Sequence, residues 1–373
     1  MKGNKLTLGF LTLLLAFLSA GHLKAQDPNF SQYFNNPIYY NPALIGADIG
    51  TKVRFQYRNQ WTQLPGEFKT INFNMDVAER KMPGSGGLGL MFNRKQEGQG
   101  FLETSNIGVG MSVRVPLQQN IVTQLGFMGS FVSRSVNWDN LIFSDQLDSR
   151  YGYIGGSNFT PPDEGGQGQV TYPDLTIGNI VRFFPESMSG SKMIGTLGVA
   201  LHHTLKPDDS YIGIPTEIPQ KWVVHGNMLW VKQGSSSTFS DNPFLGLTKY
   251  DFGFLLESWQ QRSNFALGMN VMQSNLYFGA WYKGESYGEF RSDAMVFMLG
   301  VNYGIADNAR MKIMYSYDWA LNELVSISGP THEITLIMQL DDLMMFGYGD
   351  SFGGRSGSRS GGIVKKPLEC SPF

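Results

Sequence analysis

The chain has 373 residues, of which 42% are hydrophobic, 13% aromatic and only 16% charged, and 45 are glycine. This apolar content excludes intrinsic disorder for most of the chain, and a single cysteine excludes a disulfide scaffold. A formal net charge of -2 provides no basic field for nucleic acid. The length allows one large barrel or two ordinary domains.

The first 25 residues have the pattern of a secretory signal peptide. Lys2 and Lys5 precede an apolar run that ends at Ala20, and the small residue Ala25 suits a cleavage site. The run is too short to cross a bilayer comfortably as a helix. We therefore predict that residues 1–25 are removed and that the mature chain is exported, with an uncleaved anchor as the alternative.

The mature chain alternates apolar residues with small or polar ones at a period of two. In 106–115 every odd position is apolar, and the even positions carry Asn, Gly, Ser or Arg. Segments 53–58, 264–271 and 275–283 repeat this pattern. Because successive residues of a strand point to opposite faces of a sheet, each segment has one apolar face and one small or polar face.

A soluble β-sandwich would alternate in the same way, but three features favour a membrane barrel. The predicted strands are long, about 9–13 residues against the usual 5–6. Their polar faces suit a wet lumen, and tyrosines and tryptophans gather near strand ends, as in the aromatic girdles of membrane barrels. These girdle candidates are Trp222, Trp230, Tyr277, Trp281, Tyr282, Tyr315 and Tyr317. The lipid-facing candidates are Val109, Met111, Leu267 and Met269.

The prediction is therefore an all-β fold, a transmembrane antiparallel β-barrel of outer-membrane type with about 14 strands. The predicted strands are 52–60, 67–77, 86–93, 102–115, 120–133, 172–184, 192–203, 221–232, 247–257, 262–271, 275–283, 292–304, 309–318 and 331–340. Short and long connections mostly alternate, with an exception at 233–246. Short turns belong on the periplasmic side and long loops outside.

The predicted organisation has four parts. The signal peptide 1–25 is followed by a segment, 26–50, that caps or plugs the barrel, and by the barrel itself, 51–346. Residues 347–373 form a flexible tail rich in Gly, Ser and Arg, with a docking peptide at its end. Both termini are expected in the periplasm. The longest loop, 134–171, is expected to be either a surface contact or a second plug.

Motifs for chemistry are weak. Residues 84–89 fit G-x-G-x-x-G but open a strand, which favours a tight turn with small lumen residues over a nucleotide site. Residues 284–288 fit G-x-S-x-G around Ser286, yet in a barrel loop instead of the strand-to-helix turn that a nucleophile needs. No catalytic residue and no cofactor is predicted.

Metal binding is also not predicted. His332 and Glu333 lack a second histidine four residues on, where Leu336 stands. The remaining candidates are His202, His203 and His225, which are interpreted as a polar lumen lining in preference to a metal site.

The most specific segment follows the predicted cleavage site. It is polar and aromatic, and its prolines prevent a long helix or central strand. Together with a later turn it resembles the start of the PorP/SprF family of outer-membrane proteins, D-P-x-F-S-Q-Y followed by N-P-A-x-x-G. The matching residues are Asp27, Pro28, Phe30, Ser31, Gln32, Tyr33, Asn41, Pro42, Ala43 and Gly46.

Later segments are similar to the same family. Segments 250–253, 279–282 and 315–318 resemble its later strands, and Thr331-His332-Glu333 resembles an S-H-E stretch that enters the last strand. The chain end, with Cys370, Pro372 and Phe373, resembles a C-P-x-F terminus interrupted by Ser371.

The resemblance implies a non-enzymatic role in the type IX secretion system of a Gram-negative bacterium. Family members are outer-membrane partners of secreted proteins such as gliding adhesins. The implied partners are the C-terminal domain of a secreted cargo protein, the secretion or gliding machinery in the outer membrane and periplasm, and membrane lipids, with no nucleic acid. Two alternatives remain from the residues alone: a passive channel for small or hydrophobic solutes, and a lipid hydrolase acting through Ser286.

Overall fold

The computed structural model describes residues 28–48, 50–64, 66–78, 85–98, 102–158, 160, 167–185, 191–210, 215–232, 248–273, 275–287, 289–306, 308–321, 325–340, 343–344 and 347–348. The predicted signal peptide, Asp27, and the predicted tail beyond Tyr348 with Cys370, Pro372 and Phe373 lie outside the described residues. Among the residues described, no helix has the length and apolarity to cross a membrane.

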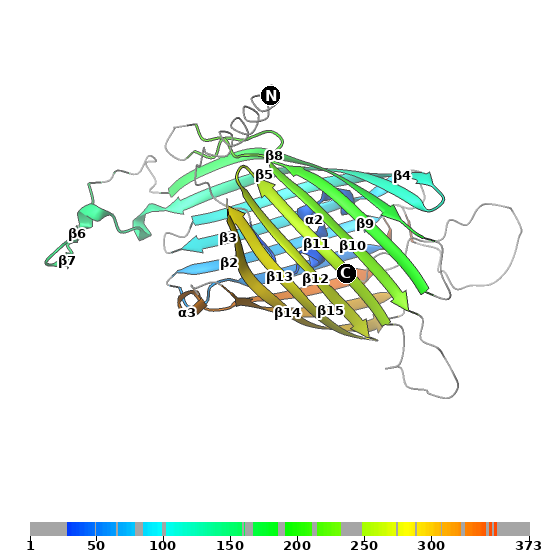
Figure 1. The fold of residues 1–373 in the computed structure, drawn as a ribbon. Helices are drawn as coiled ribbons and strands as arrows, with labels where there is room; N and C mark the ends of the chain where they lie inside the picture. The colour runs from blue at the N-terminus through cyan, green and yellow to red at the C-terminus, as the bar shows by residue number, and fades with distance from the viewer. Residues whose placement is uncertain are drawn as a thin grey trace, which may run out of the picture.

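Within this part of the chain, fourteen antiparallel strands close one barrel, which confirms the predicted fold class (Figure 1). They are β1 (Thr51–Asn59), β2 (Glu67–Ala78), β3 (Ser85–Gly98), β4 (Leu102–Gln118), β5 (Ile121–Asn137), β8 (Gln167–Phe183), β9 (Ser191–His202), β10 (Lys221–Lys232), β11 (Thr248–Trp259), β12 (Arg262–Gln273), β13 (Leu276–Tyr287), β14 (Glu289–Ala306), β15 (Ala309–Ala320) and β16 (Thr331–Leu340). The ladder between β1 and β16 closes the ring, with Thr51 opposite Leu340 and Asn59 opposite His332.

The strand register follows the alternation in the sequence. On β4, Val109 and Met111 are 59% and 52% exposed on the outer face, whereas their neighbours Gly108 and Gly110 are buried. The other two lipid-facing candidates, on β12, are also exposed. The barrel thus has an apolar outer surface and an inner surface of glycine, hydroxyl, amide and charged side chains, as a membrane barrel requires.

Two of the predicted girdle residues do not belong to a girdle. Tyr277 and Trp281 on β13 are only 1% and 2% exposed, because they share the inward face of the strand with Gly279 and Lys283. Whether these side chains face the lipid or the lumen is decided by their position in the alternation and not by their closeness to a strand end. The outer face does carry exposed aromatic residues at Trp222, Trp230, Tyr315 and Tyr317, in agreement with the prediction.

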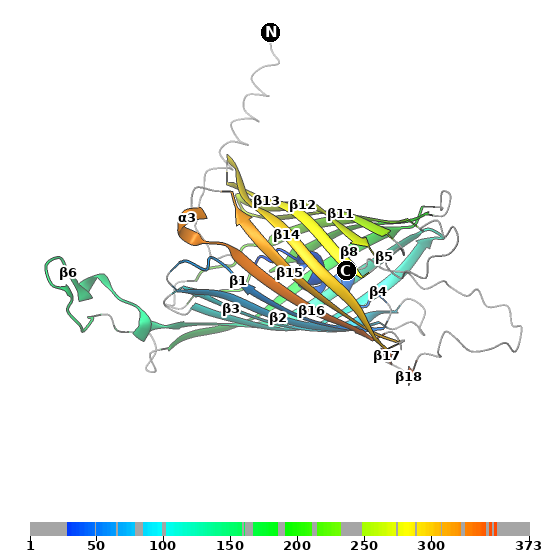
Figure 2. The same cartoon turned by 90° about the horizontal axis from the view of Figure 1, so that it is seen from below.

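The two ends of the barrel differ. At one end lie the short connections β4–β5, β12–β13 and β14–β15 together with the long connection 233–247, and here β16 ends; the short connections β11–β12 and β13–β14 lie at the opposite end. At the other end the long β5–β8 connection forms an arm, residues 138–158, which contains η3 (Trp138–Asn140), η4 (Ser144–Gln146), β6 (Leu147–Asp148) and β7 (Gly152–Tyr153). We call these the turn end and the arm end. The arm projects away from the barrel in both views, so it does not enter the lumen (Figures 1 and 2).

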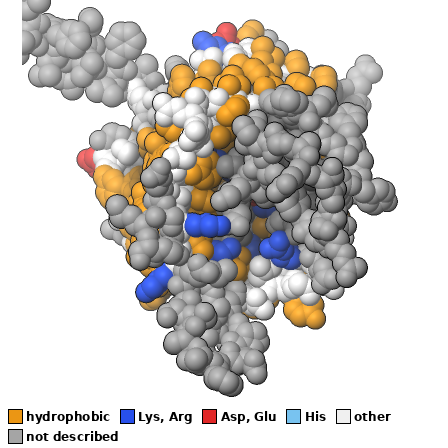
Figure 3. Space-filling view, turned by 90° about the vertical axis from the view of Figure 1, so that its right-hand side faces the viewer, with side chains coloured by type: hydrophobic (Ala, Val, Ile, Leu, Met, Phe, Trp, Pro, Cys, Tyr) orange, Lys and Arg blue, Asp and Glu red, His pale blue; other side chains and the backbone are white. Residues whose placement is uncertain are grey.

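Apart from the arm, three small described elements near the barrel ends are not part of the barrel wall. Helix α3 (Val325–Ser328) stands at the arm end, and the pair β17 (Leu343–Met344) and β18 (Gly347–Tyr348) follows β16. Seen from the turn end, lysine and arginine side chains gather near the middle of the face and apolar side chains lie further out (Figure 3).

Residues 28–48, which we call the inner segment, lie inside the barrel. They form η1 (Tyr33–Asn35), α2 (Pro37–Tyr40) and η2 (Pro42–Leu44), and the ribbon of α2 is seen between the barrel walls (Figure 1). The main hydrophobic cluster joins the inner segment to inward-facing residues of the strands. The core of this protein is therefore the filled lumen.

Candidate functional site

The inner segment is broken into short helices by its prolines. Pro37 stands in the first turn of α2 and Pro42 in that of η2, where a missing N–H costs nothing. Asn41 caps η2, since its Oδ1 accepts a hydrogen bond from the backbone N–H of Ala43 at 2.9 Å. Such a segment has few backbone hydrogen bonds of its own, so the barrel wall must satisfy its remaining polar groups.

Aromatic packing fixes the middle of the inner segment. The ring of Tyr33 meets Trp281 of β13 edge-on, with 5.2 Å between centroids, and Phe34 stacks on the same indole at 5.6 Å. Inside the segment, the backbone N–H of Phe30 donates to the hydroxyl of Tyr40 at 3.0 Å. Phe30 and Tyr40 are each only 1% exposed, so this hydrogen bond is buried.

A carboxylate holds the beginning of the segment. The backbone N–H groups of Ser31 and Gln32 donate to the two oxygens of Glu333 on β16, at 2.8 and 2.9 Å. Gln56 of β1 donates to the same carboxylate at 2.7 Å. Glu333 has 0% exposure, so its negative charge depends entirely on these donors and on the cations near it.

A guanidinium completes this cluster. Arg58 of β1 donates to Ser31 Oγ at 2.6 Å and to Glu333 at 3.0 Å, and pairs with Asp318 of β15 at 3.3 Å. The hydroxyl of Ser31 in turn donates to Asp318, and Lys283 lies 3.8 Å from the same carboxylate. We call Ser31, Gln32, Arg58, Asp318 and Glu333 the latch.

Glycines hold the end of the segment. Ala43 and Pro42 lie against Gly126 of β5 so closely that a Cβ at Gly126 would meet their backbone. The side chain of Asn41 lies against Gly178 of β8 in the same way, and donates to the carbonyls of Asn179 and Val199 at 3.2 and 3.3 Å. At these points only a residue without a side chain leaves room for the inner segment.

The following residues continue this packing. Ile45 lies against Gly89 of β3 and Gly110 of β4, and its carbonyl accepts from Ser112 at 2.6 Å and Gln124 at 2.7 Å. Gly46 has a φ of +59°, lies against Gly86 and Gly87, and its N–H donates to Asp76 at 2.9 Å. A left-handed backbone pressed against another backbone requires glycine. The wall positions that receive residues 41–46 form the glycine seat: Gly86, Gly87, Gly89, Gly110, Gly126 and Gly178.

The structure brings most of the predicted site residues together as a pair of anchors. The described residues of the D-P-x-F-S-Q-Y motif lie in or beside the latch. Among them, the carbonyl of Pro28 accepts a hydrogen bond from the hydroxyl of Tyr39 at 3.0 Å. The N-P-A-x-x-G residues lie on the glycine seat. His332 is the exception. It points to the outer face, where Tyr315 lies 2.7 Å from its Nδ1, because it neighbours inward-facing Glu333 on the strand.

Sequence reasoning named Glu333 among the predicted site residues and predicted small lumen residues in 84–89, but it missed the other wall residues of both anchors. Arg58 and Asp318 sit on inward positions of their strands, and charged residues on the polar face of a predicted strand were the available signal. The glycines 86, 87 and 89 have the structural role that was predicted for the G-x-G-x-x-G stretch, small residues in the lumen, although Gly84 lies outside the described residues.

The weaker motifs are placed as follows. Ser286 lies within β13 and not in a loop or a strand-to-helix turn, opposite Ser263 and Phe290 on the neighbouring strands. His202 Nε2 lies 3.0 Å from the carbonyl of Tyr40, and His225 lies 3.0 Å from the side-chain amide of Asn41. His203 pairs with Asp174 at 2.9 Å. In the described part of the chain, no three His, Cys, Asp or Glu residues are grouped so that they hold a metal ion.

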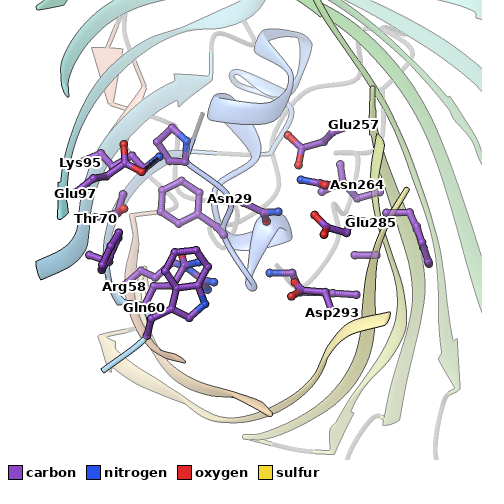
Figure 4. A pocket seen from close by; sticks show the side chains of 18 of the residues that line it. Asn29, Arg58, Gln60, Thr70, Lys95, Glu97, Glu257, Asn264, Glu285 and Asp293 are labelled. Carbon is purple, nitrogen blue, oxygen red and sulfur yellow. Dashed lines mark ion pairs between the residues drawn. The ribbon is translucent and has the colours of Figure 1, made fainter. Parts of the chain in front are cut away.

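A cavity of about 370 Å³ opens above the latch at the arm end. Pro28 and Asn29 line it, and Figure 4 shows Asn29 between two walls. One wall comes from β1–β3 and carries Arg58, Gln60, Thr70, Lys95 and Glu97; the other comes from β11–β14 and carries Glu257, Asn264, Glu285 and Asp293.

Comparison with solved structures finds other outer-membrane barrels at low similarity. The Pseudomonas putida toluene transporter TodX is 10% identical, with a TM-score of 0.40 over 82% of this chain and 92% of its own. A Pseudomonas aeruginosa FadL homologue is 10% identical, with a TM-score of 0.38 over 81% and 92%. At these identities the likeness concerns the fold alone. No curated protein matches the chain.

Comparison with family models gives a match over residues 22–338, to the model described as "Type IX secretion system membrane protein PorP/SprF". The match runs from the segment before the inner segment to the last strand of the barrel. It therefore includes the latch, the glycine seat, thirteen complete strands and β16 as far as Met338. The chain is an outer-membrane β-barrel of Gram-negative type, and it belongs to the PorP/SprF family of type IX secretion system membrane proteins.

Proposed function

We propose that this protein is a non-enzymatic outer-membrane partner of the type IX secretion system, which binds the C-terminal domain of a secreted surface protein such as a gliding adhesin. It aids the delivery or retention of that protein and links it to periplasmic components. The observation that carries the proposal is the filled lumen of a family member. The inner segment occupies the barrel with its own core, and a binding partner, unlike a porin, needs no open bore.

We infer the orientation from the longest connection between barrel strands, which contains the arm. Because long loops of outer-membrane barrels face outward, we propose that the arm lies at the cell surface and the turn end faces the periplasm. The chain leaves β16 at the turn end, so the predicted tail, 347–373, is directed to the periplasm. The inner segment begins at the arm end, where Pro28 lines the cavity. We therefore propose a periplasmic carboxyl end; the expectation for the amino end, which lies outside the described residues, stays a prediction.

The arm is our candidate for the cargo contact. Tyr151 is 75% exposed, and the other exposed apolar side chains of the arm are Ile142, Leu147, Tyr153 and Ile154. Exposed apolar groups gathered on one feature are typical of interaction sites. The arm is internally braced: the backbone N–H of Asn158 donates to Asp145 at 2.6 Å, and this bond lowers the pKa of that carboxyl. It thus presents its aromatic residues on an ordered scaffold.

A passive channel is the alternative that the strand pattern alone leaves open. The filled interior weighs against it, because solutes would have to displace the inner segment from both anchors. A secretion partner should bind a secreted domain and conduct little or no current. A passive channel should conduct and need bind no such domain.

Copurification tests the proposal. The full-length protein, solubilised in detergent, should retain the C-terminal domain of at least one large secreted protein from the same cell. The double variant Tyr151→Ser/Tyr153→Ser should lose most of this retention while the barrel still migrates as a folded, heat-modifiable species. Leu205→Ser, a change at another exposed residue of the arm end, is the matched control. Unchanged retention by the arm variant would move the contact elsewhere, and no retention of any such domain would contradict the proposal.

A further inference from the structure

We propose that the cavity at the arm end is the binding site for the mature amino terminus of this same chain, the α-amino group of Gln26 and the side chain of Asp27. This inference depends on the predicted cleavage after Ala25 and is separate from cargo binding. It makes signal-peptide removal the step that completes the inner segment.

The position of the chain supports this occupant. Pro28 and Asn29, the first described residues, line the cavity. Only two residues separate Pro28 from the predicted cleavage site, and two extended residues span at most about 7 Å. A terminus made at Gln26 therefore stays within reach of the cavity walls. An uncleaved leader of 25 residues would be about 38 Å long as a helix and would have to leave through the mouth.

The charges of the walls match those of the terminus. The β11–β14 wall presents Glu257, Glu285 and Asp293, which suit a positive α-amino group. The β1–β3 wall presents Arg58 and Lys95, which suit the carboxylate of Asp27. Several of these groups also have partners in the wall, for example Glu285 with Arg262 at 3.5 Å and Lys95 with Glu97 at 2.6 Å. The terminus would join these pairs, as Ser31 joins Arg58 and Asp318 in the latch below.

Cysteine cross-linking tests the location. In a Cys370→Ser background, Asp27→Cys is combined with Asn264→Cys, which lines the cavity on β12. The matched control combines Asp27→Cys with Gln273→Cys at the other end of the same strand. The full-length protein in outer membranes should form the 27–264 link at least tenfold more than the 27–273 link. Equal yields, or no 27–264 link while the cysteine introduced at position 27 reacts freely with an impermeant maleimide, would overturn the proposal.

Two further measurements test the charged terminus itself. The intact mass of the purified protein should correspond to a chain that begins at Gln26 with a free amino group; another start, or a cyclised Gln26 without the positive charge, would overturn it. An impermeant amine-reactive ester should label this α-amino group several-fold faster in the Glu285→Gln/Asp293→Asn variant than in the parent. Glu103→Gln, a carboxylate of β4 that does not line the cavity, should leave the rate unchanged; equal effects of both variants would overturn the assignment of the acidic wall to this site.

Discussion

The inner segment is held at its two ends by opposite kinds of chemistry. At the arm end, Glu333 and Arg58 hold Ser31 through buried charges and short hydrogen bonds. At the turn end, residues 41–46 lie on glycines of β3, β4, β5 and β8, and contact is made by closeness of backbones. We expect the first anchor to be destabilised by substitutions that remove charge, and the second by substitutions that add volume.

The difference has a physical consequence for release of the segment. In a buried ionic cluster each charge is compensated by its neighbours. The loss of one charge therefore leaves another charge buried without compensation. Volume added to a close-packed contact costs free energy, because side chains and backbone must shift to make room. If the segment ever moves during function, the latch is the end at which a change of charge would start the movement.

The largest expected effect comes from breaking the latch. Glu333→Gln keeps the shape but removes the charge that compensates Arg58 and weakens the acceptors of two backbone N–H groups. We expect the free energy of unfolding to fall by about 3–5 kcal/mol, as for other buried pairs that lose one partner. Denaturant titration of the barrel refolded in lipid measures it. His332→Gln, the outward neighbour, is the control, and an equal loss in both variants would contradict the latch.

The next effect comes from filling the glycine seat. Gly126→Ala places a Cβ against the backbone of Pro42 and Ala43, whereas a Cβ at Gly129 on the same strand meets nothing within 4 Å. We expect Gly126→Ala to cost about 1–3 kcal/mol in the same titration, as overpacked sites do. Gly129→Ala should be close to neutral. Stabilities that do not differ between the two would show that the inner segment does not rest on β5.

A smaller effect is expected at the cap between α2 and η2. Asn41→Ala removes the acceptor for the N–H of Ala43 and the bonds to two wall carbonyls. The expected cost is about 1–2 kcal/mol, the upper part of the range for N-cap residues. Asn29→Ala, in the same segment but on the cavity wall, should cost less. Protection of the inner segment from proteolysis gives a second readout, because only the loss at Asn41 should expose it.

The smallest effect is the coupling energy between substitutions in the latch and in the glycine seat. Glu333 on β16 and Gly126 on β5 are separated in the barrel by β1–β4. Their two variants should therefore be additive to within about 0.3–0.5 kcal/mol. Glu333→Gln combined with Ser31→Ala should instead depart from additivity by about 0.5 kcal/mol or more, since the two residues share a cluster. Strong coupling across the barrel would mean that the segment is held as one rigid unit.

The strands were largely predictable because the alternation of apolar with small or polar residues involves residues that are neighbours in the sequence. β10 and β16 begin and end where the sequence predicts, next to proline-containing connections. β3 runs to Gly98, five residues past the predicted end. Beyond Asn93 the strand carries polar and charged residues on both faces, so the period-two signal ends before the strand does.

The inner segment was more predictable from the sequence than the wall residues that hold it. The inner segment shows itself by its prolines and aromatic residues, and by its resemblance to a family motif. Among its partners in the wall, Glu333 was named by the same resemblance. Arg58 and Asp318 were not named, because they lie 27 and 287 residues from Ser31 in sequence and meet it only when the barrel closes in register. Trp281 was assigned to the membrane interface for the same reason: its inward partner, Tyr33, is not adjacent in sequence.

Conductance tests the central claim, that the lumen is filled by the chain's own inner segment, most directly. The intact protein and a variant in which residues 30–46 are replaced by a Gly/Ser linker of equal length are compared in planar bilayers, after both are shown to be folded by heat-modifiable migration. We expect little or no steady current for the intact protein and a large, stable current for the variant. A large, steady conductance in the intact protein would contradict the claim.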